Sequence, residues 1–156
     1  MSDVGVVRHD ESEGLRFGKL MAECYYYMAK HIVAELGWEK GAEVIRAALK
    51  EFGEDRVASM KAEAAEKGVD VTDFEKYFTI RDMPDCGWIN GEERGVVKQC
   101  LFHEVWKKYG EEGVKLGSLY CEIDFILYGG FGFHLDRPKN KCLGDDECVM
   151  NFTYDK

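Results

Sequence analysis

Helical periodicity in the first 67 residues constrains the fold of this chain more than any other feature. From Glu11 to Leu36, apolar residues recur at intervals of three and four, as on one face of an α-helix. A second stretch of this kind runs from Glu39 to Lys67, and glycines follow both stretches at Gly37 and Gly68, where helix ends favour glycine. The sequence therefore predicts two long helices, and Gly53 inside the second predicts a kink or a break.

Signals for β-strands appear after these helical segments. Asp73 to Ile80 predicts a short helix, which Thr72 or Asp73 can cap. Asn90-Gly91 is a strong tight-turn pair. We expect residues 95–102 to form a strand that pairs across this turn with residues 86–89.

The C-terminal part of the chain combines helix and strand signals. A short helix is expected at 103–109, and a longer one starts near Glu111 and ends at Gly129-Gly130. Two strands are then expected around a turn at Gly144-Asp145. The predicted fold class is α+β, with N-terminal helices packed on a small antiparallel sheet and a helical insertion that carries Cys121 and Asp124.

Length and composition limit the class of protein. A chain of 156 residues suits a single domain over 1–156, with residues 1–10 as a mobile lead-in. The net charge of −9 disfavours binding to nucleic acid or docking on an anionic membrane, since both need cationic side chains. No apolar run is long enough to span a bilayer, no signal peptide is visible, and the six cysteines suit a reducing compartment. We expect a cytoplasmic protein with a small-molecule substrate.

Cys121 and Asp124 are the first candidates for chemistry. They lie three residues apart in a predicted helix, so that both side chains point to one face. The residues around Asp124 are apolar, and a carboxylate that faces a core needs a hydrogen-bonding or ion-pair partner, or has a functional role. A cysteine nucleophile reacts as the thiolate, which a neighbouring base can produce. The alternative is that Cys121 is a small buried hydrophobic residue and that Asp124 faces solvent.

A longer pattern surrounds this pair. Tyr120-Cys121-x-x-Asp124 is followed by Gly144-Asp145-x-x-Cys148-x-Met-x-Phe152. Over roughly residues 15–155 the chain resembles the L-2-amino-thiazoline-4-carboxylic acid hydrolase family, and its C-terminal half is similar to the 4-vinyl reductase domain. The resemblance implies a hydrolase of C–N bonds in a compact cyclic amidine or amide. The type substrate would be 2-amino-thiazoline-4-carboxylate, opened to N-carbamoyl-cysteine, and we expect neither a cofactor nor a metal.

Further residues complete the candidate site. Cys100 precedes a predicted helix whose N-terminus would lower the pKa of its thiol; the family usually has Cys-Pro where this chain has Cys100-Leu101. Cys148 belongs to the family pattern and can approach Cys121. Imidazole titrates near neutral pH, which makes the histidines candidate acid–base groups. We expect Cys121, Asp124 and Cys100 to be catalytic, Cys148, His134 and His103 to bind substrate, and Arg137, Lys139 or Lys141 to bind a substrate carboxylate.

Two alternatives to the enzyme are kept. The first is a small-ligand- or metal-binding module, because three cysteines and a carboxylate are residue types that bind zinc, here Cys100, Cys121 and Cys148. Close ligand pairs such as Cys-x-x-Cys, which make a zinc motif specific, are absent from the sequence. The second is an assembly adaptor that associates through the aromatic run Tyr25-Tyr26-Tyr27. The same first helix is also the expected contact of a homo-oligomer. The charged run over 51–66 is interpreted as a solvated helix face.

Overall fold

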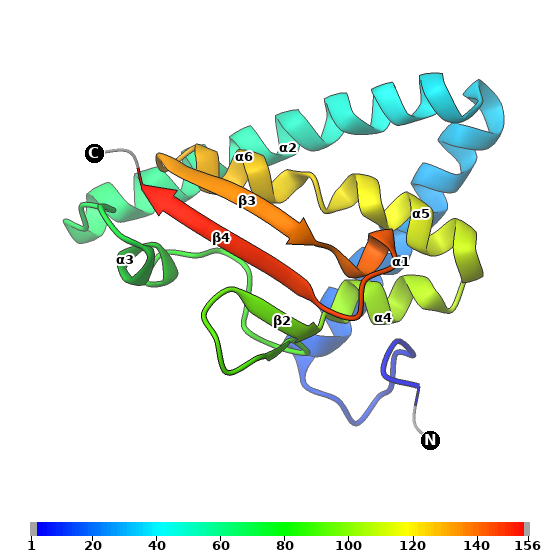
Figure 1. Cartoon of the computed structure of the whole chain (residues 1–156), viewed down its shortest axis with the longest axis horizontal. Helices are drawn as coiled ribbons and strands as arrows, with labels where there is room; N and C mark the ends of the chain where they lie inside the picture. Colours follow the sequence, from blue (N-terminus) through cyan, green and yellow to red (C-terminus); the bar gives the residue numbers. More distant parts are fainter. Residues whose placement is uncertain (1–2, 155–156) are drawn as a thin grey trace.

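The computed structural model describes residues 3–154, and it places helices against one small antiparallel sheet (Figure 1). The chain forms, in order, α1 (Glu13–Leu36), α2 (Trp38–Lys67), α3 (Phe74–Phe78), β1 (Ile89–Asn90), β2 (Val96–Gln99), α4 (Leu101–Lys107), α5 (Gly110–Tyr120), α6 (Ile123–Gly129), β3 (Phe133–Lys139), the 3₁₀ helix η1 (Lys141–Leu143) and β4 (Cys148–Tyr154). Helices come first and α4 to α6 are inserted between strands, so the predicted α+β class is confirmed.

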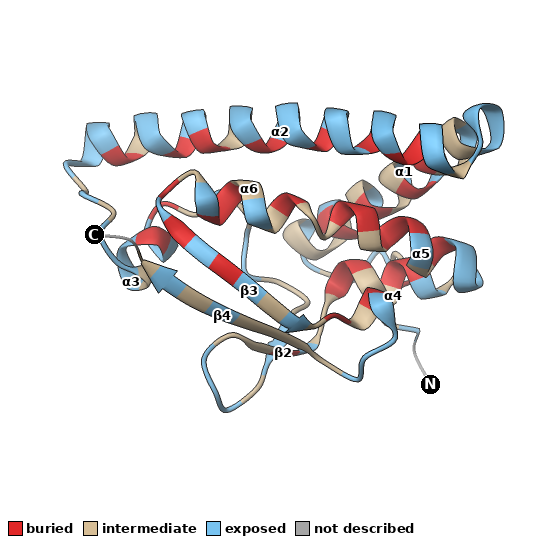
Figure 2. Cartoon of the chain, turned by 45° about the horizontal axis from the view of Figure 1, so that its top comes forward, coloured by how far each residue is buried: buried red, intermediate tan, exposed pale blue. Residues whose placement is uncertain are grey.

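The first two helices form where they were predicted. The Ser12 side chain caps α1 by accepting a hydrogen bond from the Leu15 N–H, and the helix ends at Gly37, whose φ is 77°. α2 continues through Gly53 to Lys67, so no break occurs at this glycine. Gly53 permits close approach of α6 instead, because a Cβ atom there would lie 2.9 Å from Ile126 Cγ2. One face of α2 is buried along its whole length (Figure 2).

The sheet has the strand order β1-β2-β4-β3, and all three neighbouring pairs are antiparallel. A strand does pair with β2 across this region, but it is Ile89–Asn90 and not the expected 86–89. The connection is a loop over 91–95 in place of a two-residue turn, closed by a hydrogen bond from the Gly91 N–H to the Val96 carbonyl at 2.8 Å. β2 ends at Gln99, and Leu101 and Phe102 begin α4. The expected strand over 95–102 was therefore too long, because burying these two side chains against the helices favours the helical conformation.

The helix predicted to carry Cys121 and Asp124 is divided into two. α5 ends at Tyr120 and α6 begins at Ile123, with a turn over Cys121 and Glu122 between them. The N–H groups of Glu122 and Asp124 bond to carbonyls three residues back, at 3.2 and 3.4 Å, so the helix tightens and changes direction here. No glycine or proline marks the break in the sequence.

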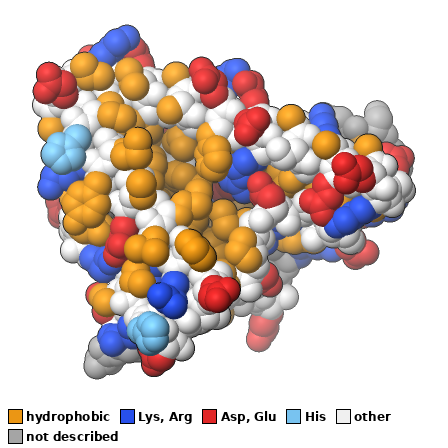
Figure 3. All heavy atoms as spheres, turned by 180° about the vertical axis from the view of Figure 1, so that it is seen from behind, with side chains coloured by type: hydrophobic (Ala, Val, Ile, Leu, Met, Phe, Trp, Pro, Cys, Tyr) orange, Lys and Arg blue, Asp and Glu red, His pale blue; other side chains and the backbone are white. Residues whose placement is uncertain are grey.

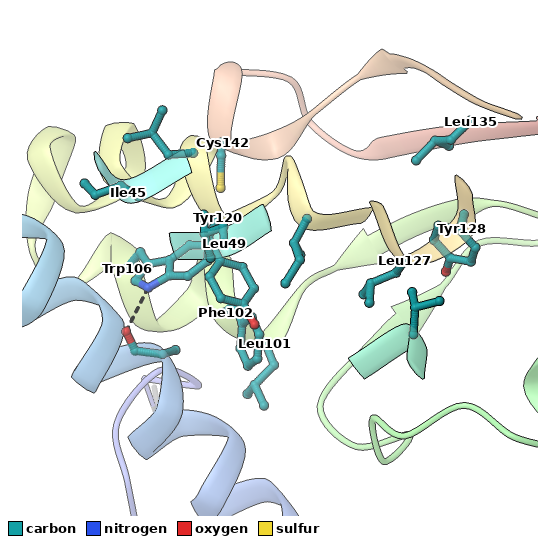
Figure 4. Packing of buried hydrophobic residues seen from close by; sticks show 14 of the residues in the cluster. Ile45, Leu49, Leu101, Phe102, Trp106, Tyr120, Leu127, Tyr128, Leu135 and Cys142 are labelled. Carbon is teal, nitrogen blue, oxygen red and sulfur yellow. Dashed lines mark hydrogen bonds between the residues drawn. The ribbon is translucent and has the colours of Figure 1, made fainter. Parts of the chain in front are cut away.

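Aromatic residues from several helices make up much of the core (Figure 4). Trp106 is 1% exposed, and its Nε1–H donates to the Ala22 carbonyl on α1 at 3.0 Å. The Tyr25 hydroxyl donates to the Leu116 carbonyl at 2.7 Å, and Tyr26 stacks on Tyr109. Two of the three consecutive tyrosines thus pack inward, whereas Tyr27 is half exposed.

The segment before α1 is tied to the helical core. The Lys19 ammonium is almost fully buried, and it donates to the Val6 carbonyl at 2.7 Å and to Glu11 Oε1 at 2.5 Å. Gly5 lies so close to α4 that a Cβ atom there would meet the Glu104 carbonyl oxygen at 2.2 Å. Across the described part of the chain, no helix combines the length and the apolar character needed to cross a membrane.

Candidate functional site

A cavity of about 530 Å³ lies between α2, α3, the segment over 81–95, the strands β2 and β4, and the helices α4 to α6. Its size is in the range of small-molecule sites. Cys121, Asp124 and Cys100 all contribute to its wall, so the three residues expected to be catalytic share one space. Apolar and aromatic side chains form much of the remaining wall, among them Phe74, Trp88, Tyr128, Met150 and Phe152.

The break between α5 and α6 places Cys121 and Asp124 at this wall. Cys121 is the C-cap residue that follows α5, and Asp124 lies in the first turn of α6. Arg137 on β3 connects them, because its Nη1 donates to Asp124 Oδ2 at 2.9 Å and its Nη2 donates to the Cys121 carbonyl at 2.8 Å. Glu122 points elsewhere and binds Arg46 on α2, at 2.8 and 2.9 Å.

The carboxylate of Asp124 is deep in the fold but not sealed. About a third of its side-chain surface, 34%, remains accessible, and the residue lines the cavity. Burial raises the pKa of Asp124, and the positive charges of Arg137 and Arg56 counter this only in part. A carboxylate with a raised pKa is a better proton acceptor near neutral pH than an ordinary one.

Cys121 rests as a neutral thiol. Its hydrogen bond with the Cys142 thiol, burial and the negative charge of Asp124 all hold the pKa of Cys121 well above the usual value. The sequence-based expectation of a thiol kept as thiolate therefore does not describe the resting protein. A base has to take the proton as the sulfur reacts.

Cys100 is the N-cap residue of α4, as its position before a predicted helix suggested. The amides of His103 and Phe102 lower its pKa, but burial outweighs them and raises the pKa of Cys100 to about 12. The prediction that the helix N-terminus would give a low pKa was wrong for this reason. Cys100 is a neutral thiol in the cavity wall.

The other sequence-based candidates lie outside the cavity wall. Cys148 is close enough to Cys121 for its pKa to be raised by that group, and its sulfur accepts a hydrogen bond from the Lys141 N–H at 3.4 Å. The His103 side chain is 12% exposed beside Glu104, and burial lowers its pKa. His134 is exposed on β3, where it pairs with Thr153.

Sequence reasoning missed several groups at this site. The charged run over 51–66 was interpreted as a solvated face, but the Arg56 side chain is only 12% exposed and binds Asp82 through two hydrogen bonds of 2.7 Å. Arg81 also lines the cavity. Cys142, which was not among the candidates, is the thiol beside Cys121. Only the full fold brings these residues together, since they lie far apart in the chain or in a loop without a motif.

Within residues 3–154, no three His, Cys, Asp or Glu side chains converge in the manner of a metal site.

Comparison with known proteins gives the chain its family. No curated protein and no solved structure matched the chain. A family model described as L-2-amino-thiazoline-4-carboxylic acid hydrolase matches residues 18–152, which includes every residue of the cavity wall. The chain therefore belongs to the L-2-amino-thiazoline-4-carboxylic acid hydrolase family.

Proposed function

We propose that this protein is a cytoplasmic hydrolase of small cyclic amidines or amides, with 2-amino-thiazoline-4-carboxylate as the model substrate. One observation carries the proposal: the Cys121 thiol and the Asp124 carboxylate line the same small cavity, in a chain that belongs to this hydrolase family. The cavity volume of about 530 Å³ exceeds that of a single five-membered ring, which leaves room for a catalytic water.

The chemistry begins with proton transfer. Asp124, whose pKa is raised, accepts the proton of Cys121 as the sulfur attacks the amidine carbon. A carbon–sulfur bond to the protein forms, and the electron pair of the C=N bond moves to the ring nitrogen, which takes a proton from Asp124. The neutral Cys100 thiol is a weak hydrogen-bond donor at the same wall.

The product determines which bond breaks next. In N-carbamoyl-cysteine both nitrogens stay on the former amidine carbon, so the ring carbon–sulfur bond is the one that opens. The amino group re-forms a C=N bond to that carbon as it loses a proton, and the ring sulfur leaves as a thiol with this proton. Water then adds to the carbon, and Cys121 is released with its proton. One water is consumed and a urea group is formed. The expected cleavage of a C–N bond applies instead to cyclic amides, in which the ring nitrogen is the leaving group.

The test is turnover by point variants. Purified protein is incubated with 2-amino-thiazoline-4-carboxylate, and N-carbamoyl-cysteine is measured by mass spectrometry. We expect Cys121→Ala and Asp124→Asn each to lower kcat by at least about 100-fold. The matched control is Cys24→Ser, which removes an exposed thiol on α1. Wild-type turnover by Cys121→Ala would exclude the covalent mechanism.

A second function is supported by the apolar part of the wall. Phe74, Trp88, Tyr128 and Phe152 present aromatic surface to the cavity, which suits binding of a flat apolar ligand without chemistry. Under this alternative the protein binds aromatic ligands tightly, and Cys121→Ala leaves their affinity unchanged. Absence of turnover on every cyclic amidine, together with such binding, would favour the ligand-binding module.

A further inference from the structure

Arg81 differs from the other cationic side chains around the reactive pair. It lies in the loop after α3, at the cavity wall. Its guanidinium carbon is 5.4 Å from the centroid of the Phe78 ring, so an aromatic face supports the group from one side. Among residues 3–154, no carboxylate lies within 4.0 Å of this guanidinium.

Every other cation considered for a substrate carboxylate already has a partner. Arg137 binds Asp124 at 2.9 Å, and Lys139 binds Glu147 at 3.2 Å. Lys141 donates to the Asp146 carbonyl at 2.7 Å. At the cavity wall, the remaining arginines pair with carboxylates: Arg56 with Asp82 at 2.7 Å and Arg94 with Glu75 at 3.3 Å.

The charge of Arg81 reaches the interior of the cavity. Burial raises the pKa values of Asp124 and Tyr128 on α6 and of Tyr77 on α3, and the positive charge of Arg81 counters part of each rise. The other wall residues near the loop include acidic groups, namely Asp85, Glu92 and Glu93. An anionic ligand group would be repelled by those carboxylates and attracted to Arg81.

We propose that Arg81 binds the carboxylate of the substrate and selects cyclic amidines that carry an acid group over those that do not. This inference rests on the proposed function, because it concerns the same cavity and the same substrate. The planar guanidinium can bind a carboxylate through two parallel hydrogen bonds. The bound acid group would then fix the ring relative to Cys121 and Asp124. Arg81 is thus a specificity-determining residue, separate from the reactive pair.

The test compares two ligands and three proteins. The ligands are 2-amino-thiazoline-4-carboxylate and 2-amino-thiazoline, which is the same ring without the acid. Wild type, Arg81→Gln and Arg81→Lys are titrated by calorimetry, and Lys40→Gln, which removes an exposed charge in the first turn of α2, controls for net charge. We expect Arg81→Gln to weaken binding of the acid about 10- to 100-fold and binding of the neutral ring less than about 3-fold. Arg81→Lys should lie between, and KM should change more than kcat.

The outcomes separate this inference from the proposed function. An equal loss for both ligands, or no loss for either, would overturn the role of Arg81. Failure of the wild type to bind the acid more tightly than the neutral ring would also overturn it. If the acid binds in an Arg81-dependent manner but is not hydrolysed, the inference stands and the hydrolase proposal fails. Thermal unfolding of each variant shows whether a loss of binding reflects loss of the fold.

Discussion

Arg137 Nη1 donates a hydrogen bond to Asp124 Oδ2 at 2.9 Å, and the Arg137 side chain is 7% exposed. The same guanidinium holds the Cys121 carbonyl at 2.8 Å and lies 4.8 Å from the centroid of the Phe125 ring. One side chain from the sheet therefore fixes the carboxylate and the helix break together. Arg137 therefore both stabilises the helix break and lowers the pKa of Asp124, which burial raises.

The pH dependence of turnover should report this link. Burial raises the pKa of Asp124, and the charge of Arg137 lowers it. Replacing Arg137 by Met removes the lowering contribution, so the pKa of Asp124 rises further. In the proposed mechanism Asp124 acts as a base in its ionised form, so the acid limb of the pH–kcat profile should move to higher pH. Arg46→Met is the control, since Arg46 binds Glu122 at the surface of the same break. An unshifted acid limb would mean that Asp124 is not the base.

The ion pair between Arg56 and Asp82 should stabilise the fold in a pH-dependent way. Burial raises the pKa of Asp82, but the hydrogen bonds and charge of Arg56 outweigh it, and the net pKa is lowered. Such a group stabilises the protein above its unfolded pKa, and this stabilisation is lost as the pH falls through the lower folded pKa. We expect Asp82→Asn to lower the free energy of unfolding by about 2 kcal/mol at neutral pH.

Urea unfolding at several pH values measures this effect. The difference between wild type and Asp82→Asn should begin to narrow below about pH 4, where Asp82 of the unfolded chain takes up a proton, and should disappear once the pH has fallen through the lower pKa of the folded state. Lys40→Gln, which breaks an exposed pair with Glu43, should change stability little at any pH. A constant difference across the whole range would show that packing, and not the charge of Asp82, accounts for the loss.

Tyr120 carries a buried hydroxyl with no hydrogen-bond partner within residues 3–154. The residue is 7% exposed and packs against Tyr25, Phe102 and Trp106. A buried polar group without a partner costs free energy, so Tyr120→Phe should raise the free energy of unfolding by about 1 kcal/mol. A higher melting temperature in scanning calorimetry would agree with this, and a lower one would show that the hydroxyl has a partner in solution.

Gly117 in α5 packs directly against the Trp106 ring and leaves no room for a side chain. A Cβ atom there would lie 2.2 Å from Trp106 Cε3, and Trp106 is 1% exposed and cannot move aside. We expect Gly117→Ala to lower the free energy of unfolding by about 3 kcal/mol. Gly129→Ala in α6 is the matched control, because no atom lies within 4 Å of its Cβ position. That variant should be neutral or slightly stabilising, since alanine favours helix.

The exposed face of α1 should mediate self-association. Large apolar side chains at Phe17, Leu20, Tyr27 and Met28 are 48 to 71% exposed, with exposed Cys24 among them, and they recur at the three- and four-residue spacing of paired helices. Hydrophobic side chains cover much of this side of the molecule (Figure 3). We expect a homodimer in sedimentation experiments, converted to monomer by Leu20→Glu combined with Met28→Glu.

Cys24 provides an independent check of this contact. In a twofold pairing centred on the exposed stripe, the two Cys24 thiols would lie opposite each other, and a short bifunctional maleimide should link them. Cys24→Ser should abolish the link while the sedimentation behaviour stays the same. A monomer at all concentrations, or a dimer that persists in the double variant, would show that these side chains do not form a dimer contact.

Local patterns in the sequence determined the long elements well. α1 and α2 follow from apolar periodicity and from the glycines after them, and Asp73 caps α3 as its position predicted. The break at Cys121 could not be found in this way, because Leu119 to Leu127 is a helix-compatible apolar stretch. Contacts made only in the folded protein hold the break, above all the hydrogen bond from Arg137.

The candidate site, like the fold, could be predicted from the sequence only in part. Cys121, Asp124 and Cys100 were found from spacing and family pattern, and they line one cavity. Their pKa values could not be predicted, since they depend on the Cys142 thiol beside Cys121 and on burial at all three residues, and both arise only in the folded core. Arg56 and Arg81 were missed because nothing local distinguishes an arginine that turns inward from one that faces water.

The helix break between α5 and α6 has a consequence for how such a protein can diversify. The proposed reactive pair, Cys121 and Asp124, lies at the ends of two helices, whereas much of the wall that would touch a ligand belongs to the segment over 74–95, outside these helices. Exchanges in that outer segment can alter which molecules are accepted while the interior pair stays in place. New substrate preferences are therefore within reach of a few surface replacements, at little risk to folding.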